Sequence, residues 1–303
     1  MPIRAVFILA GLVVLASAAC GGNSSPTSPI PPGGGAPSVP DVTEVLVGAG
    51  DIGQCGSKGP SLTAQLLDGI QGAIFTAGDN VQMDGTMQEF TNCFHPFWGR
   101  HFSRILPSPG NHDYGITAAE PYFAYFGASA GPPGLGYYSY DLGAWHVVAL
   151  NSNIPAGAGS AQEQWLRLDL ADNPSRCTIA YWHHPLFCSG GEGSDSRMRA
   201  IWRALYEFKA DVVINGHNHF YERFAPQDPT GRSDFLRGIR QFTVGTGGAT
   251  LYGFGPSIPN LEVRDNTSWG VLKLTLSPTM YDWQFVPVAG HSFRDQGSGR
   301  CVE

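Results

Sequence analysis

Short apolar runs, each followed closely by polar residues, recur along the chain. Residues 45–47, 73–75, 178–181 and 212–214 are such runs, and their length and composition predict short buried strands. In open α/β sheets, the loops beyond the carboxyl ends of strands can be polar while the sheet beneath holds them rigidly. The pattern therefore predicts a functional site at that edge of a sheet.

Apolar residues at helical spacing predict helices between these strands. Leu62, Leu66 and Ile70 share one face of a first helix, and Ser160 begins a second, because its spacing to Glu163 matches a capping box. A third helix carries an apolar stripe made of Met198, Ile201, Trp202, Leu205 and Phe208.

The last part of the chain predicts antiparallel strands. Residues 241–244, 271–276 and 281–286 have strand character, and the last two predict a hairpin. Helices alternating with strands, followed by antiparallel strands, indicate an α/β fold with two mixed β-sheets faced by helices. Residues 120–136 are rich in aromatics, Gly and Pro, and we expect an irregular lid there, with plain packing of the rings as the alternative.

The composition favours one sizeable domain over residues 41–303. The chain has 303 residues, of which 42% are hydrophobic, so it can bury a large core. The formal charge of -7 argues against a general nucleic-acid binder, because phosphate groups would have to be neutralised by a basic surface. We therefore expect no nucleic acid as a stable partner.

Residues 1–20 have the features of an export signal. Arg4 precedes an apolar run at residues 5–15, and small residues follow at 16–19. The run is too short to cross a bilayer of about 30 Å. We therefore predict an exported chain rather than a membrane span.

Cys20 follows the small residues in a way that resembles a bacterial lipoprotein signal. Ser17 is a departure, because that pattern usually has leucine there. The resemblance implies lipidation of Cys20 and a cell-envelope location, with a lipid anchor as the sole membrane contact; simple secretion after Ala19 is the alternative. Residues 21–40 are almost entirely Gly, Pro and Ser and predict a flexible linker.

Six cysteines in an exported chain favour disulfides over zinc, because no two have C-x-x-C spacing. If Cys20 is lipidated, an odd number remains and one thiol stays free. Cys55 and Cys93 follow the first two site loops and form a reasonable pair. Cys301 is expected to pair with Cys177 or Cys188.

Polar residues beyond the predicted strands supply candidate metal ligands. Singly, each is more typical of a turn, a cap or a core hydrogen bond, but together they indicate a metal site. Two metal ions about 3.5–4 Å apart would activate water and neutralise the charge that builds up when a phosphate ester is attacked. One carboxylate must bridge such a pair, and Asp79 is the candidate. The candidate ligands are Asp51, Asp79, Asn111, His183, His217 and His219, and His112 is the candidate catalytic residue.

Five motifs follow one another in a recognisable order. They are Gly50-Asp51-Ile52-Gly53, Gly78-Asp79, Gly110-Asn111-His112-Asp113, His183-His184-Pro185 and Gly216-His217-Asn218-His219. The order resembles the calcineurin-like metallophosphoesterase superfamily over most of residues 41–290, and implies a four-layer fold in which two mixed sheets form a sandwich flanked by helices. The run from His217 to Arg223 is most similar to the purple acid phosphatase branch.

The resemblance also implies roles for these residues. One metal would be held by Asp51, Asp79 and His219, and the second by Asp79, Asn111, His183 and His217. His112 would contact the phosphate and protonate or polarise the leaving oxygen, a general-acid role that suits an imidazole. Asp113 is expected to orient His112.

The chain departs from the purple enzymes at Gln82, where they carry a tyrosine ligand. Their colour comes from that tyrosinate on iron(III), so we expect a colourless protein. Gly53 does not supply the histidine that other branches carry, which leaves Gln82, Gln54 or water to complete the first metal site. The mixed nitrogen and oxygen ligands admit zinc, manganese or iron.

The resemblance implies a phosphomonoesterase that uses metal-bound hydroxide for in-line attack on a small phosphorylated substrate, and the amino-terminal signal implies that it is exported. A phosphodiesterase of the same superfamily is the close alternative. A surface-anchored binding protein without turnover is the third hypothesis, and the incomplete first metal site is the feature that favours it.

Overall fold

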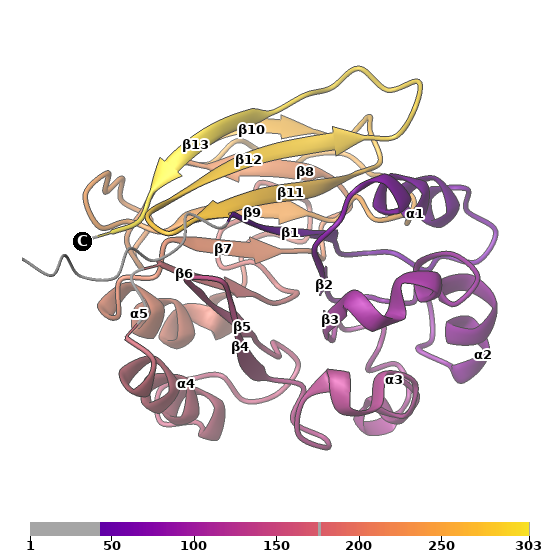
Figure 1. Ribbon diagram of the computed structural model, residues 1–303, viewed down its shortest axis with the longest axis horizontal. Coiled ribbons are helices and arrows are strands. Elements are labelled where there is room, and N and C mark those ends of the chain that lie inside the picture. The colour runs from indigo at the N-terminus through magenta and orange to yellow at the C-terminus, as the bar shows by residue number, and fades with distance from the viewer. Residues whose placement is uncertain (1–42, 175–176, 303) are drawn as a thin grey trace, which may run out of the picture. The chain divides into compact units, whose positions relative to one another are not determined.

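The computed structural model describes residues 43–174 and 177–302, which contain two β-sheets (Figure 1). Across the first sheet, the strand order is β13 (Gln296–Arg300), β12 (Met280–Pro287), β11 (Gly270–Ser277), β1 (Glu44–Ala49), β2 (Ala73–Ala77) and β3 (Ile105–Ser108). Across the second, it is β10 (Leu261–Asp265), β8 (Tyr221–Phe224), β9 (Arg240–Val244), β7 (Val212–Asn215), β6 (Cys177–Tyr181), β5 (Trp145–Ala149) and β4 (Tyr138–Leu142).

The α-helices connect these strands on the outside of the sheets (Figure 1). They are α1 (Gly59–Gly69), α2 (Met87–Glu89), α3 (Glu120–Phe126), α4 (Ala161–Asp172) and α5 (Arg199–Glu207). Within the described ranges, no helix combines the length and the apolar character needed to span a membrane.

Both sheets are mixed, as the sequence predicted. Strands β1, β2 and β3 are parallel, as are β5, β6 and β7, whereas β11, β12 and β13 run antiparallel to their neighbours. The α/β prediction of two mixed sheets with flanking helices is therefore confirmed. All six of the parallel strands named here end toward loops that carry polar residues, so the carboxyl edge of each sheet is the place to look for a site.

The central strands are apolar throughout because both of their faces are covered. In β6, Ile179 and Tyr181 belong to the core between the sheets, and the Tyr181 ring lies 5.7 Å from the ring of Phe75 in β2. Ala180 faces the other way, into a second cluster with Trp202 of α5. This two-sided burial explains why the strand at residues 178–181 appears as a continuous apolar run.

The segment expected to be an irregular lid is largely helical. It contains α3, and Tyr122 and Phe126 on that helix are fully or almost fully buried. Phe126 packs edge-on against Phe90 at 5.9 Å. Ring packing, the alternative interpretation of this segment, is therefore what the structure shows for these two residues.

The predicted helices occur, but two of their inner faces differ in detail. In α1 the buried side chains are Thr63, Ala64 and Leu67, whereas the expected face that contains Leu66 lies at the margin of the core. Phe208 is 37% exposed because α5 ends at Glu207, one residue before it.

Strands β8, β10 and β13 were not predicted. In β8, the charged residues Glu222 and Arg223 interrupt the apolar pattern that predicts a buried strand, although the whole segment is buried. Strand β13 contains no large apolar side chain, and its Gly297 lies against the indole of Trp283. A Cβ atom there would lie 2.3 Å from that ring. The sequence signal was lost in both cases to a tertiary contact.

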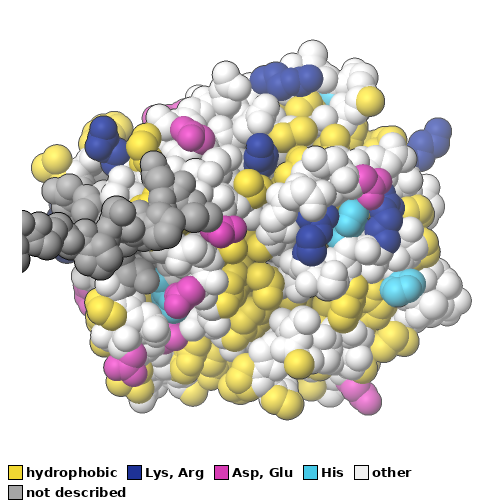
Figure 2. Space-filling view, in the orientation of Figure 1, with side chains coloured by type: hydrophobic (Ala, Val, Ile, Leu, Met, Phe, Trp, Pro, Cys, Tyr) yellow, Lys and Arg dark blue, Asp and Glu magenta, His cyan; other side chains and the backbone are white. Residues whose placement is uncertain are grey.

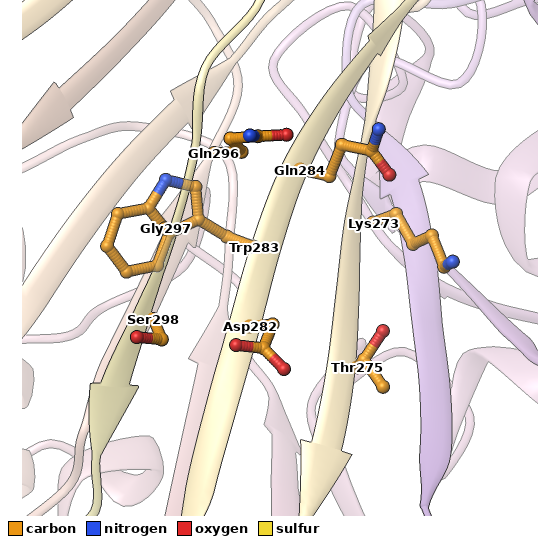
Figure 3. Close-up of a pocket in the computed structure, with 8 residues that line it drawn as sticks. All are labelled: Lys273, Thr275, Asp282, Trp283, Gln284, Gln296, Gly297 and Ser298. Carbon is orange, nitrogen blue, oxygen red and sulfur yellow. The ribbon is translucent and has the colours of Figure 1, made fainter.

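The outer face of β11, β12 and β13 is polar and holds a cavity of about 430 Å³ (Figure 3). Asp282 and Gln284 alternate along β12 with buried aromatic residues, as expected for a strand with one solvated face. This cavity contains none of the predicted site residues. Acidic and basic side chains are interspersed on the face of the domain drawn in Figure 2.

Two disulfides tie the domain together. Cys55 is bonded to Cys93, as predicted, and Cys301 is bonded to Cys177, one of its two expected partners. Cys188 is free and buried. The second disulfide fastens the end of the chain to the start of β6.

Asp211 lies beside this second disulfide and gives a prediction for stability. Its carboxylate is buried and accepts hydrogen bonds from the backbone nitrogens of Thr178 and Val302, at 2.7 and 2.6 Å. Burial nevertheless raises the pKa of Asp211 to about 7. Because the folded-state pKa is the higher one, the stabilising contribution is present at acidic pH and is lost as the pH rises through about 7.

We expect the free energy of unfolding, measured with urea, to fall between pH 5 and pH 8 by up to about 3 kcal/mol through this group. Asp211→Asn should lower stability at both pH values, because its amide accepts fewer hydrogen bonds, but should remove this pH dependence. An equal pH dependence in the variant would contradict the assignment.

Candidate metal centre

Every predicted ligand lies just beyond the carboxyl end of a strand. Asp51 and Asp79 each stand two residues after a strand of the first sheet, β1 and β2. His183 and His217 stand two residues after β6 and β7 of the second sheet. Asn111 follows β3, and His219 precedes β8. The two sheets therefore contribute ligands to the same edge of the domain.

The chain turns sharply at three of these residues. Asp51, Asp79 and His217 have positive φ angles of 59°, 49° and 73°. Residues with side chains rarely adopt this conformation, and it tends to occur where surrounding contacts hold a functional residue in place. Here the contacts are backbone hydrogen bonds between the loops, such as Asp51 N to the Gly78 carbonyl at 3.0 Å.

His183 shows how the site favours a positive charge. Its Nδ1 lies 2.9 Å from the carbonyl oxygen of Ala77, which can only accept, so Nδ1 carries a proton. Its Nε2 then faces two further acceptors, Asn111 Oδ1 at 2.9 Å and Asp79 Oδ2 at 3.2 Å. Three electron-rich atoms that converge in this way need a proton or a metal ion between them.

His219 is held in the same way, with a backbone carbonyl at Nδ1 and the carboxylate of Asp51 at Nε2. Its Nδ1 lies 2.8 Å from the Thr250 carbonyl oxygen, and its Nε2 lies 3.3 Å from Asp51 Oδ1. That oxygen is buried and has no hydrogen-bond partner within the described part of the chain. The other oxygen of Asp51 accepts a hydrogen bond from His217 N at 2.8 Å. The pair thus presents an imidazole nitrogen and a carboxylate oxygen with free lone pairs.

The two halves of the site are close to one another. One ligand atom from each of Asp51, Asp79 and His183 lies within 4.8 Å of the others, and the ring of His217 lies 5.0 Å from that of His183. The residues supply both nitrogen and oxygen ligands, which fit zinc, manganese or iron. The structure thus brings all six predicted ligands together in a geometry that fits metal ions.

The electrostatics of the site agree with this geometry. Burial opposes a charge on His183, but the carboxylate of Asp79 raises the pKa of His183 to about 9. Burial would raise the pKa of Asp79, yet the neighbouring His183 holds it below the usual range. Burial and the positive charge of His183 lower the pKa of His217 to about 4, so that His217 is neutral at neutral pH. Positive charge is therefore favoured between Asp79 and His183.

We expected Asp113 to orient His112, but a backbone carbonyl does so instead. Its Nδ1 lies 2.8 Å from the carbonyl oxygen of Met83, and its Nε2 lies 4.0 Å from Asp79 Oδ2. The side chain is 35% exposed, so the ring is partly open to solvent.

Asp113 instead fastens the loops beneath the site. Its buried carboxylate accepts hydrogen bonds from the backbone nitrogens of Asn80, Val81 and Gly110, and from the Asn80 side chain. Its backbone neighbours are site residues, but its side chain faces the protein interior. The expectation failed because adjacency in sequence says little about direction in a tight turn.

The two glutamines named for the first metal site differ in position. Gln82 Nε2 lies 3.4 Å from Asp79 Oδ2, at the site. Gln54 Oε1 accepts hydrogen bonds from the backbone nitrogen and the hydroxyl of Thr250, at 2.6 and 3.1 Å. In this arrangement Gln82 is the better placed of the two to complete the site.

Two residues that the sequence analysis did not assign border the site. His184 lies with its ring 4.4 Å from that of His217, and its Nδ1 lies 2.8 Å from Ser152 Oγ. Tyr252 donates a hydrogen bond to the His217 carbonyl at 2.8 Å, and its ring lies 4.3 Å from that of His219. His184 could have been suspected from its motif, whereas Tyr252 comes from a distant loop without a motif.

With this geometry established, the comparisons with known proteins define the class of protein. A family model described as calcineurin-like phosphoesterase matches residues 45–221, which is more than half of the chain. The chain therefore belongs to this family, and the predicted resemblance is confirmed.

Similar proteins include purple acid phosphatases. Purple acid phosphatase 21 of Arabidopsis thaliana is 35% identical over 124 residues, which cover 37% of this chain and 26% of that protein. Acid phosphatase type 7 of Homo sapiens is 26% identical over 210 residues, which cover 58% of this chain and 46% of that protein. The matched segments thus span less than half of either relative.

Solved structures with the same fold cover more of the chain. Purple acid phosphatase PPD1 from yellow lupin superposes with a TM-score of 0.75 over 85% of this chain and 54% of that chain, at 21% identity. GAP50, the anchor in the inner membrane complex of Plasmodium, has a TM-score of 0.69 over 86% of this chain and 90% of that chain, at 13% identity. Both likenesses support the two-sheet fold.

The central position of Asp79 gives a prediction for metal binding. Asp79→Asn removes the negative charge that faces His183, and we expect it to weaken metal binding by about a hundredfold or more, since even partners of ligands contribute about 10- to 100-fold. Metal retained after desalting, measured by mass spectrometry, checks this. The matched control is Asp84→Asn, which removes an exposed carboxylate from the same loop; equal metal loss in both variants would contradict the assignment.

Proposed function

We propose that the chain is a phosphoric ester hydrolase with two metal ions and that phosphomonoesters are its substrates. The observation that carries this proposal is the convergence of six potential ligands on one edge, with the Nε2 of His112 facing them. Membership of the phosphoesterase family and the similarity to acid phosphatases support it.

The residues divide into two overlapping ligand sets. Asp79 can contribute to both sets, because its ligand atom lies within 4.8 Å of ligand atoms of Asp51 from the first set and His183 from the second. Asp51, Asp79 and His219 would hold one ion, and Asp79, Asn111, His183 and His217 the other. Metal ions bound in this way would activate a water molecule and neutralise the charge that develops on the phosphate.

His112 is the group that acts on the leaving oxygen. The Met83 carbonyl keeps the proton of Nδ1 and holds the ring so that Nε2 points toward the site. A proton carried on Nε2 can then pass to the alcohol as its bond to phosphorus breaks. Such general-acid catalysis typically contributes about 10²- to 10⁴-fold to the rate.

We also propose that the chain is exported and that a lipid on Cys20 anchors it at the cell envelope. The lipoprotein-like signal at residues 1–20 supports this. The two disulfides of the domain support an oxidising compartment as well, because such bonds are rare in reducing ones.

Hydrolysis of p-nitrophenyl phosphate and of its bis-ester tests the activity, using purified protein loaded with zinc, manganese or iron. We expect the monoester to be cleaved faster. His112→Ala should lower kcat for the monoester by about 10²- to 10⁴-fold while leaving metal content unchanged. Faster cleavage of the diester would change the assignment to a phosphodiesterase.

The control for His112→Ala is His95→Ala. His95 is another exposed histidine, and its ring is hydrogen-bonded to the Tyr125 hydroxyl. The substitution should leave kcat unchanged. Bound metal without cleavage of either ester would instead favour the non-catalytic binding hypothesis.

Gln82 gives a spectroscopic prediction. With iron(III) bound, the protein should lack the visible band of a tyrosinate ligand, because Gln82 occupies the tyrosine position and lies beside Asp79. We expect Gln82→Tyr with iron(III) to gain a visible charge-transfer band, whereas Gln82→Phe should not. Without such a band in the tyrosine variant, residue 82 would not lie within reach of the metal.

A further inference from the structure

The loop between β2 and α2 places a strained residue directly beside His112. Met83 has a φ angle of 90°, which is unfavourable for any residue with a side chain. Its carbonyl oxygen is the atom that orients the His112 ring. Its side chain, however, is not needed for that hydrogen bond and is 65% exposed.

This loop is held firmly on both sides of Met83. Gln82 N donates to the Gly53 carbonyl at 3.2 Å, and Asp84 N donates to Glu89 Oε1 at 3.3 Å. The capping box of Thr86 and Glu89 then begins α2. The backbone is thus over-determined, which is the condition under which local strain persists. An exposed methionine at a fixed position beside the general acid is the result.

A second apolar side chain comes from the His112 loop itself. Ile116 is 36% exposed and stands four residues after His112. The two loops are in close contact, because a Cβ atom on Gly115 would lie 2.4 Å from the Asp84 carbonyl oxygen. Met83 and Ile116 therefore present apolar surface from adjacent loops.

The charges of these loops exclude an anionic partner at this place. Residues 82–89 and 110–117 contain no lysine or arginine, but they include Asp84, which is exposed, and Glu89. On these two loops, a substrate with a second phosphate next to the scissile bond would meet acidic groups and no lysine or arginine. An uncharged, apolar group would meet the methionine, whose flexible thioether adapts to different shapes.

We propose that Met83 forms a wall of the leaving-group site and makes the enzyme selective for phosphomonoesters of apolar, uncharged alcohols. This inference rests on the proposed function, since it takes His112 as the group that protonates the leaving oxygen. The alcohol attached to that oxygen would lie next to Nε2 of His112, and Met83 adjoins the same ring, with its carbonyl oxygen 2.8 Å from Nδ1.

The test compares n-hexyl phosphate, glycerol 1-phosphate and pyrophosphate as substrates of the metal-loaded protein. The first two have alkyl leaving groups, so their difference reports chiefly on binding of the alcohol. We expect kcat/KM to be highest for n-hexyl phosphate and lowest for pyrophosphate.

Met83→Gly is the decisive variant because glycine favours positive φ and keeps the carbonyl that holds His112. It should lower kcat/KM for n-hexyl phosphate by about five- to tenfold through lost apolar contact. The loss for glycerol 1-phosphate should be smaller, so that the ratio of kcat/KM for n-hexyl phosphate to that for glycerol 1-phosphate falls. Met83→Asn, also tolerant of positive φ, should give the same pattern, and Met87→Ala, which removes a nearby exposed methionine, should change neither substrate.

The outcomes separate the two claims. If n-hexyl and glycerol phosphates are both cleaved and their ratio is the same in Met83→Gly, the leaving-group site is wrong while the phosphatase function stands. An equal loss for both substrates would mean that Met83 acts by positioning His112, which also overturns the inference. If the metal-loaded protein cleaves none of the esters, the proposed function fails, and the inference fails with it.

Discussion

The close contact between loops of the two sheets is the constraint on which the candidate metal centre depends. The loops beyond β1, β2 and β7 meet at the Ala77 carbonyl oxygen. A Cβ atom on Gly216 would lie 2.5 Å from this oxygen and 2.8 Å from Asp51 Oδ2. Similarly, a Cβ atom on Gly78 would lie 2.5 Å from Nδ1 of His183. Because these positions lack side chains, ligands from both sheets come within reach of the same ions.

Backbone carbonyls set the direction of three imidazoles in this site. His183, His219 and His112 each place Nδ1 near a main-chain oxygen, at distances of 2.8 to 2.9 Å. In each case Nε2 is left to face a carboxylate of Asp51 or Asp79. The carbonyls belong to the ends of strands and the loops beyond them, so the rigidity of the sheets is passed on to the ligands.

The loop after β2 carries two unusual features of this chain. Gln82 stands in place of a tyrosine ligand and contacts Asp79. Met83 combines an unusual backbone conformation with an exposed apolar side chain. The proposed bridging carboxylate of Asp79, the carbonyl that orients His112 and the proposed wall of the leaving-group site thus lie within five consecutive residues.

The candidate site was predictable from sequence because its ligands follow apolar runs, and parallel strands bring such positions to one edge. All seven residues, from Asp51 to His219, lie together as expected. Most strands were also predictable, because burial on both faces leaves a continuous apolar run. Strands β8 and β13 were not predictable. Glu222 and Arg223 in β8, and Gly297 in β13, occupy these positions because of contacts with residues distant in sequence.

What only the tertiary structure decided is direction. Sequence placed Asp113 next to His112, but the turn aims its carboxylate at Asn80, and the His112 ring is held by Met83 instead. It left Cys301 with two possible partners, and the packing of the chain end against β6 selects Cys177. Apolar and polar patterning determines where strands end and which residues gather there, because burial is a local preference of each segment. The orientation of each side chain depends on backbone angles and neighbours that arrive from elsewhere in the chain.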